Sequence, residues 1–208
     1  MSPSSVDAVA RYFERRYPAR ASWLSGTIVR RGERELSGLL RSWLPSKDGF
    51  DLLDVGCGDG TLLSQILLAR PRRLRLEDLI PANVSAATAL LRGRAHEIEG
   101  VIGDAGTLVD PSTYDVVLAT GVLDYYPRWQ QLLRTLVARS RGTLIFDVPR
   151  GGCFHHQLRR IWLATQGISL QVPTGDELAT VLHGLGSWRM AVTKFSVAIR
   201  LDINGAAG

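Results

Sequence analysis

A glycine-rich turn between two apolar segments constrains this chain of 208 residues more than any other feature. Residues 52–63 read LLDVGCGDGTLL, in which an apolar run leads into Gly56, Gly58 and Gly60 and then into a segment with helical periodicity. Glycine tolerates positive φ, and its missing side chain lets a ligand lie against the backbone at the start of the helix. The stretch therefore predicts a strand, a ligand-binding turn and a helix. A dinucleotide fingerprint, G-x-G-x-x-G, would need glycine where Thr61 stands, which weakens a nicotinamide interpretation.

The composition predicts one soluble globular domain, because 45% of the residues are hydrophobic and 22% are charged. The net charge of +5 comes almost entirely from arginines, which are scattered through predicted helices and give little support to a nucleic-acid surface. Cys57 and Cys153 lie far apart without a CxxC partner, which predicts neither a metal site nor a disulfide and fits a reducing cytoplasm. The sequence lacks a signal peptide and a run of ~20 apolar residues, so we expect a cytoplasmic protein with no membrane partner.

Apolar periodicity and turn residues predict the other elements. Two helices separated near Pro18 should precede the glycine turn, and the sequence from Thr174 to Glu177 has the form of a capping box at a helix start. The remaining predicted elements are strands over residues 74–78, 97–102, 114–120 and 141–148, a helix over 153–165, and two closing strands over 188–193 and 195–203.

An acidic residue at the end of the first strand makes the turn more specific. Asp54 stands two residues before G-x-G-x-G, and this pattern resembles motif I of the class I S-adenosylmethionine (SAM) dependent methyltransferases. The resemblance implies an α/β fold with a Rossmann-like, doubly wound, seven-stranded sheet, mostly parallel, with a C-terminal antiparallel hairpin and helices on both faces. It also implies a single domain over residues 1–208, with an N-terminal helical lid (1–46) and a SAM-binding core (50–204). The implied cofactor is SAM, the product is S-adenosylhomocysteine (SAH), and no metal is implied.

The same resemblance suggests the cofactor contacts. Asp78 follows the second strand about 20 residues after motif I, and Pro81 three residues later is expected to open a helix. Asp78 therefore corresponds to the carboxylate that binds the ribose hydroxyls, with Glu77 as the alternative one residue away. Asp104, in the phrase GDA, corresponds to the residue that receives the adenine amino group. The further candidates are Tyr12, Tyr17, Cys57, Leu79, Ala105 and Thr120, besides Asp54 and the three motif I glycines. Tyr12 and Tyr17 belong to the lid, where their aromatic faces either cover the sulfonium or pack the first helix onto the domain.

The segment after the fourth strand should face the methyl group, because loops at the carboxyl ends of parallel strands build the site. The phrase YDVVLATGVLDYYP resembles the small-molecule branch that includes magnesium-protoporphyrin and ubiquinone-type O-methyltransferases. Tyr125 stands where the porphyrin enzymes have histidine, so their acid/base histidine cannot be transferred to this chain. The candidates for removing a proton from the acceptor are Asp124, Tyr125, Tyr126, His155 and His156.

These features predict a SAM-dependent methyltransferase that acts on an oxygen or nitrogen atom of a small molecule, as a monomer or homodimer, with specialised metabolism as the expected setting. The D/N-P-P-Y/F phrase of enzymes that methylate amino groups of DNA is absent, which argues against a nucleic-acid substrate. Two alternatives remain open: methylation of an RNA or a protein, and a non-catalytic SAM-fold subunit that serves a partner enzyme.

Overall fold

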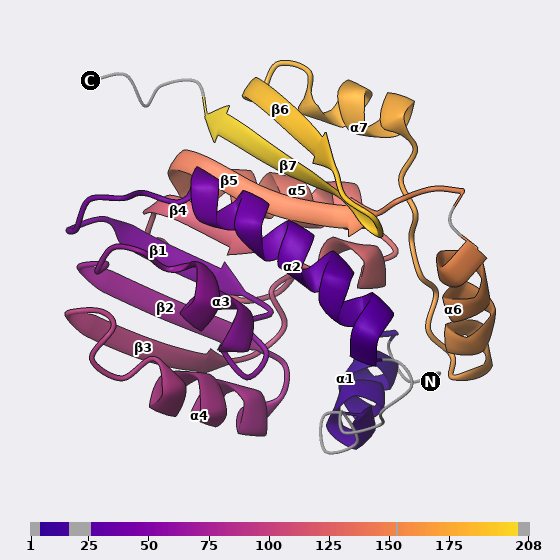
Figure 1. Cartoon of the computed structure of the whole chain (residues 1–208), viewed down its shortest axis with the longest axis horizontal. Helices are drawn as coiled ribbons and strands as arrows, with labels where there is room; N and C mark the ends of the chain where they lie inside the picture. The colour runs from indigo at the N-terminus through magenta and orange to yellow at the C-terminus, as the bar shows by residue number, and fades with distance from the viewer. Residues whose placement is uncertain (1–4, 17–25, 153, 204–208) are drawn as a thin grey trace.

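A seven-stranded sheet with helices on both faces forms the part of the chain that the computed structural model describes, residues 5–16, 26–152 and 154–203 (Figure 1). The strand order is β3-β2-β1-β4-β5-β7-β6; the pairs from β3 to β5 are parallel, and β7 runs antiparallel to both β5 and β6. The strands are β1 (Asp51–Val55), β2 (Arg73–Asp78), β3 (Glu97–Ile102), β4 (Tyr114–Ala119), β5 (Ser140–Pro149), β6 (Gly186–Val192) and β7 (Ser196–Ile203). The predicted sheet, including its antiparallel end, is confirmed.

The helices divide between the two faces because side chains along each central strand alternate between them. Leu52 of β1 packs in a core with α2, α3 and α4, whereas Leu53 packs in a second core with α5 and α7. Figure 1 shows α2, α3 and α4 on one face of the sheet and α5 on the other. The helices are α1 (Ser5–Arg16), α2 (Gly26–Trp43), α3 (Thr61–Ile66), α4 (Pro81–Leu90), the 3-10 helix η2 (Leu123–Tyr125), α5 (Trp129–Ala138), α6 (Phe154–Thr165) and α7 (Gly175–Leu182).

Two helix starts have the local causes that the sequence predicts. Pro81 is the first residue of α4, where its fixed φ fits the helix and its missing N–H costs nothing. Thr174 caps α7: its hydroxyl accepts the Glu177 N–H at 3.2 Å, and the Glu177 carboxylate accepts the Thr174 N–H at 2.7 Å. The predicted capping box is therefore confirmed.

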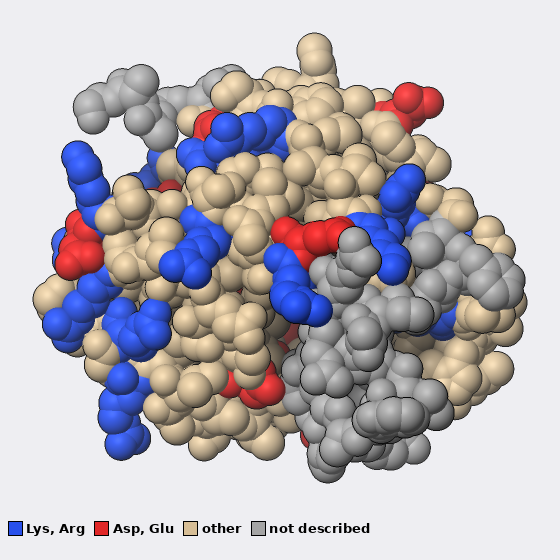
Figure 2. Space-filling model, in the orientation of Figure 1, with Lys and Arg blue, Asp and Glu red and all other residues tan. Residues whose placement is uncertain are grey.

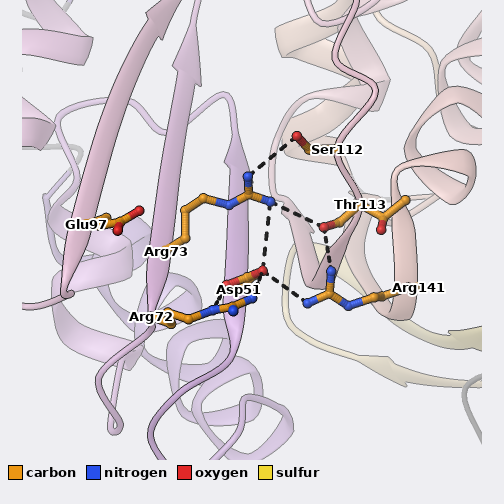
Figure 3. A pocket seen from close by; sticks show the side chains of 7 residues that line it. All are labelled: Asp51, Arg72, Arg73, Glu97, Ser112, Thr113 and Arg141. Atoms are coloured by element: carbon orange, nitrogen blue, oxygen red, sulfur yellow. Dashed lines mark hydrogen bonds and ion pairs between the residues drawn. The ribbon is translucent and has the colours of Figure 1, made fainter. Parts of the chain in front are cut away.

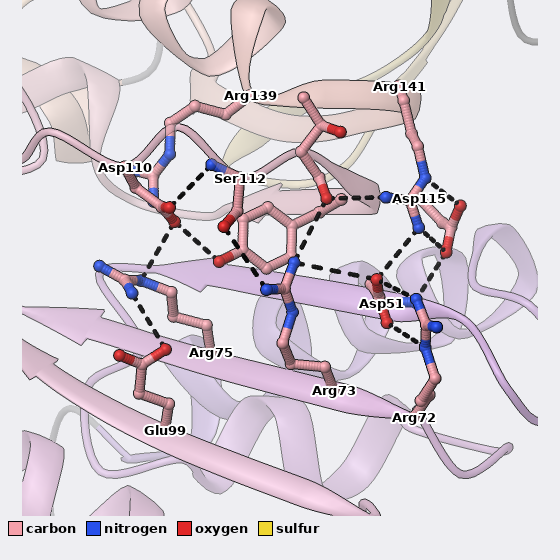
Figure 4. Close-up of polar contacts among 12 residues, drawn as sticks. Asp51, Arg72, Arg73, Arg75, Glu99, Asp110, Ser112, Asp115, Arg139 and Arg141 are labelled. Carbon is pink, nitrogen blue, oxygen red and sulfur yellow. Dashed lines mark hydrogen bonds and ion pairs between the residues drawn. The ribbon is translucent and has the colours of Figure 1, made fainter.

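A network of ion pairs takes the place of a helix on one face of β2 and β3. Residues 103–113, which connect β3 to β4, contain no helix, and β2 turns Arg75 and Glu77 toward this face. Glu77 accepts hydrogen bonds from Arg75 at 2.7 Å and from Arg139 at 2.6 Å, and Arg139 also pairs with Asp110 at 3.2 Å. Figure 4 shows Arg75, Asp110 and Arg139 of this network and its continuation from Arg75 to Glu99. A buried charge is tolerated only with such partners, so the network holds β2 and β3 to the amino end of β5.

A second group of arginines joins the amino ends of the strands, at the edge of the sheet opposite the glycine turn. Arg72, Arg73 and Arg141 surround the buried carboxylate of Asp51, with the Arg72 pair at 2.6 Å and the Arg141 pair at 3.1 Å (Figure 3). Their side chains, with those of Glu97, Ser112 and Thr113, line a cavity of about 450 Å³. The hydrogen bond from Arg72 is the main cause that holds the pKa of Asp51 below its usual value. The arrangement ties β1, β2 and β5 together where they begin.

Basic side chains lie in separate groups on the face that Figure 2 shows, with no continuous basic patch across it. This agrees with the scattered arginines of the sequence. Within the described ranges, no helix combines the length and the apolar character needed to cross a membrane. Nor do the described residues bring together three His, Cys, Asp or Glu side chains that could hold a metal ion.

Candidate active site

The glycine turn follows the carboxyl end of β1, and every second residue in it has left-handed backbone angles. Gly56, Gly58 and Gly60 have φ of 69°, 55° and 79°, values that other residues rarely adopt. A Cβ atom on Gly60 would lie 2.9 Å from the Cα atom of Ala87, and one on Gly56 would collide with Val122. The turn therefore requires glycine for its backbone and its packing, and it presents bare peptide groups to the crevice beside it.

Asp78 lies against this turn from the neighbouring strand. Its carboxylate accepts the Gly58 N–H at 2.9 Å, the Ile80 N–H at 2.9 Å and the side-chain amide of Asn83 at 3.2 Å. Glu77 lies on the other face of the sheet, where both of its oxygens are bound by Arg139. Of the two acidic residues at the end of β2, Asp78 is thus the one that faces the predicted cofactor crevice.

Asp54 and Cys57 lie buried beside the turn. Asp54 is 4% exposed, and its burial, together with the negative charge of Asp78, raises its pKa to about 8. A cationic ligand close to Asp54 would lower its pKa again, because a positive charge favours the ionised carboxylate. Burial also raises the pKa of the Cys57 thiol, whose sulfur contacts the Gly58 carbonyl oxygen at 3.5 Å. Cys57 is therefore a packed neutral thiol rather than a nucleophile.

Asp104 and Tyr126 are joined at the end of β3. The Tyr126 hydroxyl donates a hydrogen bond to Oδ1 of Asp104 at 2.5 Å. This Oδ1 atom also accepts the Gly106 N–H at 2.9 Å. Burial and this carboxylate raise the pKa of Tyr126, so its hydroxyl stays protonated. Ala105 is buried beneath the pair. The sequence suggested Tyr126 as a catalytic group, and the structure shows its hydroxyl bound to the residue predicted to bind adenine.

Replacing Tyr126 with phenylalanine is expected to weaken SAM binding about 5–10-fold, because Asp104 loses a hydrogen bond worth ~1 to 1.5 kcal/mol. Calorimetric titration with SAM measures the effect. Tyr114→Phe is the matched control: it removes a buried hydroxyl that donates to Asp110 at 2.8 Å within the ion-pair network. The control should lose stability and keep its SAM affinity; equal affinities of the two variants would contradict the role of Tyr126.

A buried polar cluster follows β4, where the acceptor was expected. Asp124 in η2 is 3% exposed, and its Oδ1 atom has no hydrogen-bond partner among the described residues. Burial raises its pKa to about 7; Arg159 opposes the shift and Asp147 adds to it. Asp147, at the end of β5, accepts the Gly121 N–H at 2.7 Å beside Thr120.

Arg159 of α6 completes this cluster and was not among the residues predicted from the sequence. It forms an ion pair with Asp124 at 3.9 Å, donates to the Tyr125 hydroxyl and lies 5.5 Å from the centre of the Tyr125 ring. Burial raises the pKa of Tyr125, so this hydroxyl is neutral and a poor base. The basic and apolar alternation over residues 153–165 indicated the helix, but only the packing of α6 shows which arginine turns inward.

Aromatic side chains close the cluster from the N-terminal side. Tyr12 of α1 is 4% exposed and contacts Trp162 of α6 edge to face, with 5.3 Å between ring centres. Phe13 contacts Tyr125 in the same way at 5.1 Å, and Leu79 packs against this group. These contacts pack α1 onto α6 and η2, and Figure 1 shows α1 beside α6. Tyr17 and the side chains of His155 and His156 lie outside the described residues.

The geometry fits SAM. The bare glycine turn, the Asp78 carboxylate one strand away and the Asp104 pair one strand further lie in sequence along the carboxyl edge of β1, β2 and β3. In open α/β sheets this edge is where a nucleoside binds. The buried carboxyl group of Asp54 would ionise beside a bound cation and supply a negative charge close to it.

Comparison with known proteins supports this assignment. Residues 53–141 match the family model described as a methyltransferase domain. Magnesium protoporphyrin IX methyltransferase (ChlM) from Synechocystis PCC 6803 with bound SAM is 16% identical, with a TM-score of 0.70 over 98% of this chain and 99% of that chain. The N-methyltransferase NodS from Bradyrhizobium japonicum WM9 with SAH is 15% identical, with a TM-score of 0.67 over 94% and 98% of the two chains.

A third structure, the DhpI–SAH complex, is 14% identical, with a TM-score of 0.68 over 98% of this chain and 100% of that chain. A search of curated proteins finds no significant match to the sequence. At these identities the solved structures establish the fold, and the family model identifies the domain. The matched residues 53–141 contain the glycine turn, Asp78 and Asp104, and together with the topology of the seven-stranded sheet they support a SAM-dependent methyltransferase.

Proposed function

We propose that the chain is a single domain, with a lid over residues 1–46 and a core over 50–204, that methylates an oxygen or nitrogen atom of a small molecule. The observation that carries this proposal is the buried Asp124: its Oδ1 atom has no hydrogen-bond partner among the described residues, and its neighbour Tyr125 packs with side chains of α6 and α1. A site enclosed in this way suits a small acceptor better than an RNA strand or a protein chain, which would need an open groove.

The residues that hold the cofactor are Gly56, Gly58 and Gly60 through their backbone, Asp78 at the ribose and Asp104 at the adenine, with Asp54 close to the positive charge. When bound, SAM supplies an electrophilic methyl group on a sulfonium. The protein's main contribution is to position the acceptor atom in line with that methyl group and to exclude water. The packing of Tyr12 and Phe13 against α6 and η2 serves the second purpose.

Asp124 is the group that we assign to proton removal. A base works best when its pKa lies near the working pH, and the pKa of Asp124, at about 7, meets this condition. The hydroxyls of Tyr125 and Tyr126 are kept neutral by burial and are bound to Arg159 and Asp104. Asp124 therefore accepts the acceptor's proton on its unpartnered oxygen.

Turnover is expected to rise with pH through about 7, because only the ionised form of Asp124 accepts a proton. Asp124→Asn should lower kcat about 100-fold or more and abolish this pH dependence, while SAM affinity stays the same. The measurement is SAH formation between pH 5.5 and 8.5 with a panel of small hydroxyl and amine acceptors, beside a SAM titration. A pH profile that persists in Asp124→Asn would exclude Asp124 as the base. SAM binding without turnover on any small acceptor would favour a non-catalytic subunit, and turnover on RNA or protein would favour a macromolecular substrate.

A further inference from the structure

We propose that Arg159 acts with Asp124 to select an acidic hydroxyl group, such as that of a phenol or an enol, as the methyl acceptor in preference to an amine. The inference rests on the proposed function and narrows it from oxygen or nitrogen to oxygen.

Arg159 and Asp124 form a pair that is close in space but incompletely bonded. The Nη1 atom of Arg159 lies 3.9 Å from the Oδ2 atom of Asp124, which is within ion-pair distance and beyond that of a hydrogen bond. The other carboxylate oxygen, Oδ1, is buried without a hydrogen-bond partner among the described residues. A buried carboxylate oxygen without a donor is costly, so this geometry favours a ligand that brings an O–H or N–H group.

The titratable groups that face Asp124 or its partner Arg159 come from four elements. Asp124 and Tyr125 lie in η2, Asp147 at the end of β5, Arg159 in α6 and Tyr12 in α1. Burial raises the pKa of Asp147 as well as that of Asp124, whereas a guanidinium keeps its charge at all working pH values. Arg159 is thus the permanent charge of the cluster, and it is positive.

Proton transfer from a hydroxyl leaves the total charge of the cluster unchanged. The acceptor O–H bond breaks, the proton binds to Oδ1 of Asp124, and the electron pair remains on the acceptor oxygen. The negative charge has then moved from Asp124 to that oxygen, and Arg159 can stabilise it there in place of the carboxylate. The acceptor oxygen forms its bond to the methyl carbon as the C–S bond breaks, and the electron pair of the C–S bond goes to sulfur. Asp124 later releases its proton to solvent.

An amine has the opposite charge balance. It enters as an ammonium ion at neutral pH, and its methylated product is again cationic once protonated. Arg159 repels both species beside the buried Asp124, where charges interact more strongly than in water. The same guanidinium that stabilises an oxygen anion therefore disfavours an amine, which makes Arg159 a specificity residue.

Two probes of similar size test this preference: 4-nitrophenol, whose ionised form is yellow, and the cationic 4-nitrobenzylamine. SAM affinity is measured first by calorimetry; its absence would refute the proposed function as a whole. With SAH-loaded protein, we expect 4-nitrophenol to bind at least about tenfold more tightly than the amine, with its ionisation shifted to lower pH.

Arg159→Gln should abolish the preference and the shift, and Arg159→Lys should keep part of both because it keeps the charge. Arg160→Gln, which removes the same charge from the exposed side of α6, should change neither. Tighter binding of the amine, a preference that survives Arg159→Gln, or no binding of either probe to protein that binds SAM would overturn this inference and leave the cofactor assignment intact.

Discussion

Asp78→Ala is expected to reduce SAM affinity by a factor of about 100 or more. The carboxylate is the predicted partner of the ribose hydroxyls, and a hydrogen bond to a charged group is worth ~1.5 to 3 kcal/mol. The Asp78 carboxylate also orders the turn on which the cofactor rests, because it accepts the Gly58 and Ile80 N–H groups. The substitution removes this acceptor as well. Calorimetric titration of wild type and variant with SAM measures the loss.

Asp59→Ala provides the comparison for Asp78. Asp59 belongs to the same turn, and its carboxylate accepts the exposed Thr61 N–H at 3.0 Å. Its removal deletes a negative charge close to Gly58 and Gly60 without removing the proposed ribose ligand. We expect its SAM affinity to stay within about threefold of wild type. If both variants lost affinity equally, the general charge of the turn, and not Asp78, would account for binding.

Arg139→Ala is expected to destabilise the fold by about 3 kcal/mol or more. Glu77 is 1% exposed and would lose the guanidinium that binds both of its oxygens, leaving Arg75 as a partial partner. For a chain of this size that corresponds to a fall in Tm of roughly 6–12 °C, which thermal unfolding followed by circular dichroism can measure. SAM affinity per folded molecule should change little, because the pair lies on the face of β2 away from Asp78.

The double variant Glu77→Leu with Arg139→Met tests the physical cause of this loss. If the cost of Arg139→Ala arises from an uncompensated buried carboxylate, removing both charges should recover most of the stability, since apolar side chains of similar volume can replace a buried ion pair. A double variant as unstable as the single one would show that Arg139 acts mainly through Asp110, its other partner.

The sequence predicted the parts of the molecule that depend on neighbouring residues. The glycine turn, the helix start at Pro81 and the capping box at Thr174 each need a short pattern, and the structure has all three. The buried strands of the sheet also follow from local apolar runs. Asp78 and Asp104 lie along one edge because parallel strands bring their carboxyl ends together, whereas their cofactor contacts come from the family resemblance and stay predictions.

The parts that the sequence did not predict depend on contacts between distant segments. Arg159 reaches Asp124 from 35 positions further along the chain, and nothing in the spacing of α6 distinguishes it from Arg160. Tyr126 was assigned to catalysis because it follows β4, but its hydroxyl binds Asp104. One signal was present and unused: Arg73, Arg75 and Glu77 alternate with leucines along β2, which indicates a strand with one polar face.

The carboxylates at the two edges of the sheet lose their charge at different pH values as the solution is acidified. At the strand starts, arginine partners and hydrogen bonds keep the pKa of Asp51 low and that of Asp110 at about 2, so their contribution to stability is lost as the pH falls toward these values. At the strand ends, Asp54 and Asp124 titrate near neutrality, so mild acidification neutralises them long before the arginine pairs open. The enzyme should consequently be switched off reversibly by moderate acid while still folded, a resting condition from which neutral buffer restores it.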